Sequence, residues 1–245
     1  MGEPRMNALI IQWVALGLCV LGAAVRIPGL RKRHGRTIFA ALVLLTVAVA
    51  LSIEPIYLAV DGLLGGANIA NLLLRLALYA VFLLLGIRMA AAFDSNLARR
   101  LVVGPVGVAI LALVVAATLY FFVTSELSGS STALRDFGDQ DTVQHYAAAG
   151  RLYPGYVAAC LVIPAVAAVL DHEARTIHRV ASAFLACSFS IVVVFVLLRL
   201  TPVNLMAWDI VLPFSAIVLT VVGLCLIWLS HTLGRRRNQQ ANKLV

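Results

Sequence analysis

Charged side chains are scarce in this sequence. Only 12% of its 245 residues are Asp, Glu, Lys or Arg, whereas 62% are hydrophobic. An average soluble domain is about one quarter charged and about half apolar. A water-soluble core of this size could not bury so much apolar surface. The composition therefore excludes an ordinary soluble domain and predicts an all-α, polytopic membrane protein that has the lipid bilayer as its main partner.

Sequence motifs for catalysis, metal binding and redox chemistry are lacking. The four cysteines lie inside apolar runs, and none forms a CxxC or a zinc-like spacing. The sequence has no HExxH or GxSxG motif, and its last apolar segment contains no lysine that could carry retinal. We therefore expect no enzymatic activity, no metal and no cofactor.

The net charge of +8 does not point to nucleic acid, because the positive residues lie in short connections between apolar runs. There they are expected to set the topology of the chain in the membrane.

Seven segments are long and apolar enough to cross a bilayer, which requires about 20 residues per helix. They comprise residues 7–25, 37–60, 69–93, 101–123, 146–170, 178–200 and 208–231. We predict a single seven-helix transmembrane domain over residues 1–245. The segment 146–170 begins with Arg151 and Pro154 close to its start, so an alternative is that this start lies in the membrane interface.

The basic residues are distributed unevenly between the two sides of the predicted membrane. Fourteen of the nineteen Lys and Arg residues fall in one set of connections and in the C-terminal tail, four fall on the opposite side, and Arg75 lies within a span. The positive-inside rule assigns the basic side to the cytoplasm. The prediction is a protein of the bacterial inner (plasma) membrane, with its N-terminus outside and its C-terminus inside.

Polar residues at membrane depth give the first functional hypothesis, because an ionisable group there is costly. Glu54 lies near the outer end of segment 37–60, and Arg75 lies at a similar depth in segment 69–93. Helical spacing extends each into a polar stripe. The candidate ligand-binding residues are Glu54, Tyr57, Asp61, Asn68, Asn71, Arg75 and Tyr79.

These residues leave three interpretations open. They could line a hydrated cavity in the outer half of the bundle, or Glu54 and Arg75 could form an ion pair that only joins two helices. A proton relay is the third interpretation. The inner half of the predicted bundle has few polar residues.

The longest outer connection, residues 124–144, is rich in Ser and Gly and then acidic at Asp136, Asp139 and Asp141. Such composition is typical of a solvated, mobile loop. It lacks the spacing of an EF-hand, so a calcium site is not predicted.

The segment that follows the second predicted span contains a D-x-L-L-G-x-x-N-x-A motif, formed by Asp61, Leu63, Leu64, Gly65, Asn68 and Ala70. With the basic stretch RKRHGR before that span, it resembles the N-terminal membrane region of an actinobacterial family of integral membrane proteins. Members of that family have about seven helices and are regarded as transporters without established substrates. The resemblance covers about fifty residues and implies the same fold and the same membrane location.

Three functions follow as hypotheses. The first is a transporter that binds a small molecule or lipid headgroup in an outer-half cavity. The second is a receptor or sensor that signals to a cytoplasmic protein partner. The third is a structural subunit of a membrane complex. The sequence leaves the ligand and the oligomeric state open.

Overall fold

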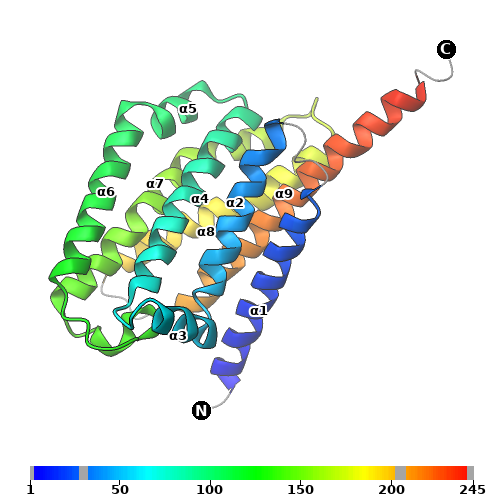
Figure 1. Ribbon diagram of the computed structural model, residues 1–245. Coiled ribbons are helices and arrows are strands. Elements are labelled where there is room, and N and C mark those ends of the chain that lie inside the picture. Colours follow the sequence, from blue (N-terminus) through cyan, green and yellow to red (C-terminus); the bar gives the residue numbers. More distant parts are fainter. Residues whose placement is uncertain (1–2, 28–32, 202–207, 242–245) are drawn as a thin grey trace.

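The protein is a bundle of α-helices that run side by side (Figure 1). This computed structural model describes the backbone of residues 3–27, 33–201 and 208–241, and the side chains of residues 9–27, 36–201 and 208–229. No strand occurs in those backbone ranges, so the prediction of an all-α fold is confirmed there. The helices are α1 Glu3–Ala24, α2 Arg33–Ala50, α3 Glu54–Leu63, α4 Ile69–Ala92, α5 Asn96–Val103, α6 Pro105–Thr124, α7 Asp141–Leu170, α8 Thr176–Arg199 and α9 Trp208–Ala241, with a short 3-10 segment, η2, at Thr132–Phe137.

Five segments of the described chain are long and apolar enough to cross a membrane. They are Ile69–Ala92, Asn96–Thr124, Asp141–Leu170, Thr176–Arg199 and Trp208–Leu229. The bent pair α2 and α3 adds a sixth if the two helices count as one span, and α1 contributes a shorter apolar stretch, Leu9–Ala24. Length and composition thus support a multi-pass membrane protein.

The bundle has two different ends, which we name by the short helices that lie there. The α3 end carries α3 and η2, and the α5 end carries α5 and the connection between α7 and α8 (Figure 1). The first residues of α1 lie at the α3 end, and α9 extends beyond the α5 end.

The predicted span 37–60 is wrong as a single straight helix, because the chain turns by 95° between α2 and α3. Ile53 is extended and Pro55 occupies the first turn of α3. Proline has no amide hydrogen to continue a preceding helix, but it is well tolerated in the first turn of a new one. Hydropathy is continuous across this bend, which is why the sequence suggested one helix.

The predicted span 101–123 is also divided. Ser95 caps the start of α5 by accepting a hydrogen bond from the amide of Ala98 (3.2 Å), and α5 ends at an extended Gly104. Pro105 then begins α6. A Cβ atom on Gly104 would overlap the carbonyl oxygen of Arg100, so this corner requires glycine.

The connection 124–144 is exposed over much of its length, as its composition suggested, but it is also anchored at Leu134. Leu134 is buried with Val143 and Tyr146 in a small apolar cluster, where aromatic side chains that include Phe121 and Phe137 pack against it. The apolar residues spaced among the polar ones supply this anchor.

Helix α7 runs without a break over 30 residues and starts five residues before the predicted position 146. Arg151 and Pro154 therefore lie inside one continuous helix. Helix α8 packs between α7 and α9. Within that group Ser188 donates a hydrogen bond to the carbonyl of Ala216 (2.7 Å) and lies 2.6 Å from the hydroxyl of Thr220.

Candidate functional site

Asp61 is fully buried and organises the turn between α3 and α4. Its carboxylate accepts hydrogen bonds from the backbone amides of Asn68 (3.0 Å) and Ala70 (3.0 Å) and from the hydroxyl of Ser130 (2.6 Å). The two amides belong to the start of α4, where the helix has unsatisfied donors and favours negative charge. Asp61 therefore acts as an N-terminal cap supplied by another helix.

Asn68 ties the same turn to the connection before η2. Its side-chain carbonyl accepts hydrogen bonds from the Tyr57 hydroxyl (2.9 Å) and the Ser131 amide (2.8 Å), and its amide donates to the Gly129 carbonyl (2.7 Å). Asn68 adopts a left-handed conformation with φ of 57°, which asparagine tolerates better than most residues. The conspicuous Asp and Asn of the sequence motif thus hold this turn together.

The interpretation in which Glu54 and Arg75 form an ion pair is not supported, because the two side chains form no such pair. Glu54 is exposed in the first turn of α3, beyond the 95° bend, and lines a separate cavity of about 520 Å³ with Arg135 and Asp136. Among the described side chains, the only ion pair joins Arg199 Nε to Asp209 Oδ1 at 3.0 Å. That interpretation failed because it assumed that α2 continues straight through residue 54.

Arg75 is held against α7 instead. The centre of its guanidinium lies 4.3 Å from the centroid of the Tyr146 ring, within the range of a cation–π interaction. The Tyr146 hydroxyl donates to the side-chain carbonyl of Asn71 (3.0 Å), which fixes the ring in place. A Cβ on Gly150 would overlap Arg75 Nη1, so glycine at this position makes room for the guanidinium.

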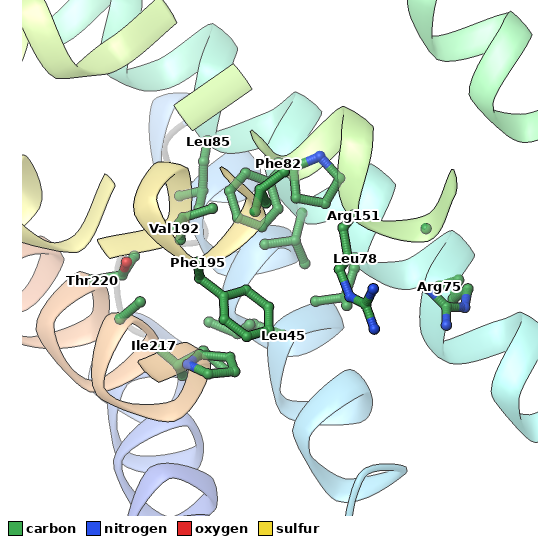
Figure 2. Close-up of a pocket in the computed structure, with 16 residues that line it drawn as sticks. Leu45, Arg75, Leu78, Phe82, Leu85, Arg151, Val192, Phe195, Ile217 and Thr220 are labelled. Carbon is green, nitrogen blue, oxygen red and sulfur yellow. The ribbon is translucent and has the colours of Figure 1, made fainter. Parts of the chain in front are cut away.

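Arg75 also faces a cavity of about 180 Å³ at the centre of the bundle (Figure 2). Side chains from α2, α4, α7, α8 and α9 line it. Its lining consists of Leu45, Arg75, Leu78, Val81, Phe82, Leu85, Gly150, Arg151, Pro154, Val192, Phe195, Val196, Pro213, Ala216, Ile217 and Thr220. The lining is therefore apolar except for two arginines and one threonine.

Arg151 is the functional candidate that the sequence hypothesis missed. The sequence placed it close to the start of a span at residue 146, and it was not included among the candidate ligand-binding residues. Since α7 begins at Asp141, Arg151 lies ten residues into the helix, about 15 Å from its start. The signal was present, because the rule that identified Arg75 applies equally to Arg151.

Tyr79 is the remaining predicted site residue, and it does not line this cavity. Its buried hydroxyl lies 2.7 Å from that of Thr118, which donates to the carbonyl of Val114 (2.7 Å). Tyr79 therefore donates to Thr118 and joins α4 to α6. The edge-on ring of Tyr153 packs against it with centroids 6.0 Å apart.

The seven predicted site residues thus divide into four groups. Tyr57, Asp61 and Asn68 form the hydrogen-bonded turn at the α3 end, and Asn71 and Tyr79 bond to tyrosine or threonine partners within the bundle. Glu54 lies apart from them. Only Arg75 reaches the central cavity.

The described part of the chain contains no group of three His, Cys, Asp or Glu side chains that could hold a metal ion.

Comparison with protein-family models, curated proteins and solved structures finds no match for this chain.

Proposed function

We propose that this protein crosses a bacterial plasma membrane seven times, with the α3 end outside and the α5 end in the cytoplasm. Helices α1, α2, α4, α6, α7, α8 and α9 would be the spans. The basic residues support this orientation, because Arg99, Arg100, Arg175 and Arg179 belong to α5 and to the segment around the α7–α8 connection. The resemblance to an actinobacterial membrane family is consistent with the same topology.

Within that frame we propose that the protein binds a small molecule or lipid headgroup in the central cavity, as part of a transport function. The observation that carries this proposal is that Arg75 and Arg151 line one cavity that is otherwise apolar except for Thr220. In the proposed topology both arginines lie between the two membrane faces. Keeping two cationic groups there costs free energy, and such groups commonly mark a ligand pathway. An ion pair with Glu54 does not explain the two arginines, because Arg75 forms no such pair.

The helix contacts support transport in particular. Helix α2 packs mainly on α1 and α4, whereas α8 packs on α7 and α9. The cavity lies where these two groups meet. Small rigid-body movements between helix groups around a central site are a common transport mechanism.

A receptor or sensor is the second candidate, and the packing between the cavity and the α5 end favours it. Leu85, Met89, Leu185 and Leu224 are almost fully buried in one apolar cluster on that side. A sensor requires no continuous path through the bundle, whereas a transporter must open one.

The decisive experiment fills the cavity without altering the lipid-facing surface. Val192→Trp places a large side chain from α8 into the cavity, and Val194→Trp places the same side chain on the exposed face of that helix. In proteoliposomes that contain candidate solutes, we expect Val192→Trp to abolish uptake and Val194→Trp to retain it.

Two results would reject transport through this cavity. One is uptake by Val192→Trp at the wild-type rate with the fold intact. The other is solute binding in the cavity without uptake by the wild-type protein, which would favour the sensor.

A further inference from the structure

The cavity is electrostatically one-sided. Arg75 and Arg151 both contribute to its lining, and no Asp or Glu among the described residues does so. Asp209, whose charge acts on Arg151, is already paired with Arg199 at 3.0 Å. A ligand that carries negative charge would compensate the two guanidiniums, whereas a cationic ligand would add to the repulsion between them.

Arg75 is arranged to receive an anion rather than only to carry charge. Its guanidinium lies 4.3 Å from the centroid of the Tyr146 ring and occupies space that a Cβ on residue 150 would fill, and its buried Nε has no hydrogen-bond partner among the described residues. A guanidinium presents a rigid fork of donors that matches a carboxylate or a phosphate. The unpaired Nε donor of a guanidinium that packs between Tyr146 and Gly150 suits such recognition.

The rest of the cavity fits an alkyl chain. In the view of Figure 2 both arginines lie on one side and Thr220 lies on the opposite side, with apolar side chains such as Phe82 and Phe195 between them. The arrangement pairs a charged end with a short apolar compartment.

We propose that the ligand is an anionic amphiphile, in which a carboxylate or phosphate binds Arg75 and Arg151 and an alkyl chain occupies the apolar part of the cavity. This inference rests on the proposed function, because it names the ligand class of the same cavity. Both a free alkyl acid and a lipid with an anionic headgroup offer this chemistry.

The first test compares three probes of equal chain length with the full-length protein in a neutral detergent. Octanoate and octyl phosphate carry the anion, and octanol is the neutral control. Calorimetric titration should show saturable binding of at least one anionic probe, with octanol at least tenfold weaker. Equal binding of octanol would overturn the inference while leaving the cavity as a binding site.

The second test removes the charges one at a time. Arg75→Gln and Arg151→Gln should each weaken binding of the anionic probe roughly tenfold, the effect of losing about one charge-assisted hydrogen bond. Arg88→Gln is the matched control, since Arg88 lies on the same helix as Arg75 and donates to the Thr37 hydroxyl instead. Wild-type affinity in both cavity variants would overturn the inference.

Two further variants separate recognition from folding. Arg75→Lys keeps the charge but loses the planar fork, so it should fold and still bind several-fold more weakly. Gly150→Ala should displace the Arg75 guanidinium and weaken the binding of the anionic probe without changing the binding of octanol. An unchanged affinity for the anion in both would contradict the assigned role of Arg75.

A third test identifies the source of the anion. The protein is reconstituted in nanodiscs of phosphatidylcholine with or without phosphatidic acid, and bound lipid is read by native mass spectrometry. Retention of phosphatidic acid by the wild type but not by Arg75→Gln indicates a lipid headgroup. Binding of octanoate without lipid retention indicates a free acid. Absence of all anionic binding overturns the inference, and if Val192→Trp also leaves uptake unchanged, the proposed function itself fails.

Discussion

At the scale of single residues, a buried hydroxyl contributes according to whether it has a partner. The hydroxyl of Tyr79 bonds to Thr118, whereas that of Tyr153 is buried without a hydrogen-bond partner among the described residues. Burying an unpaired hydroxyl costs about 1–3 kcal/mol, and a formed hydrogen bond contributes about 1 kcal/mol. The two rings pack against each other, so they form a matched pair for mutation.

We predict that Tyr79→Phe lowers the free energy of unfolding by about 1 kcal/mol, because Thr118 loses its donor. Tyr153→Phe should leave the free energy unchanged or raise it, because it removes an unpaired polar group. Reversible unfolding in mixed micelles measures both. A loss of 1 kcal/mol or more in Tyr153→Phe would show that its hydroxyl has a partner.

A second residue-scale prediction concerns two carboxylates of the candidate site. Asp61→Asn should lower the free energy of unfolding by about 2–3 kcal/mol, since one of the oxygens that receive the Asn68 and Ala70 amides becomes a donor. Glu54→Gln makes the same neutralisation at an exposed position and should change the free energy of unfolding by less than about 0.5 kcal/mol.

The measurement is again unfolding in mixed micelles, with probe binding recorded in parallel. Equal destabilisation by the two variants would contradict the assignment of Asp61 as the cap of α4. If Glu54→Gln loses ligand binding and Asp61→Asn does not, Glu54 belongs to the ligand-binding site.

At the scale of elements, two breaks in the chain determine where the polar residues lie. Both are encoded by local sequence, at Pro55 and at Gly104 with Pro105. Hydropathy concealed them, because each break lies inside a continuous apolar run. The helices without internal breaks, such as α4 and α8, could be predicted to within a few residues. The position of Glu54 could not, because it depends on the direction of the chain after the bend.

The corner between α5 and α6 yields an element-scale prediction. A Cβ on Gly107 would overlap the carbonyl oxygens of Leu101 and Val102, so Gly107→Ala must open the corner and should cost more than about 2 kcal/mol of stability. Gly17→Ala is the matched control, because its Cβ would meet no atom within 4 Å and alanine favours helix.

Thermal unfolding of the two variants tests this corner. The melting temperature of Gly107→Ala should fall by several degrees, and that of Gly17→Ala should stay or rise. Equal melting temperatures would show that α5 can be displaced at little cost.

At the scale of the whole molecule, the bundle is asymmetric, with a hydrogen-bonded turn at one end and basic connections at the other. The sequence was sufficient to identify Arg75 and the uneven basic residues. It was insufficient for the cavity, because Leu45, Arg151 and Thr220 are far apart in the chain and meet only through packing. The same packing brings Arg151 to the cavity and places Gly150 beside the Arg75 guanidinium.

The orientation gives a prediction at this scale. In a variant that lacks the four native cysteines, Glu126→Cys lies in an exposed connection at the α3 end and His172→Cys in an exposed connection at the α5 end. A membrane-impermeant maleimide should label the first in intact cells and the second only after permeabilisation. The reverse pattern would invert the proposed topology.

The most direct measurement of the central claim is photo-crosslinking with octanoate that carries a diazirine at the end of its alkyl chain. The account predicts covalent insertion into cavity residues of α4, α8 and α9, among them Phe82, Phe195 and Ile217, and its loss in Val192→Trp. Mass spectrometry of the labelled peptides locates the insertion. Labelling confined to exposed apolar residues such as Leu113 and Ile163, and equal in Val192→Trp, would contradict it.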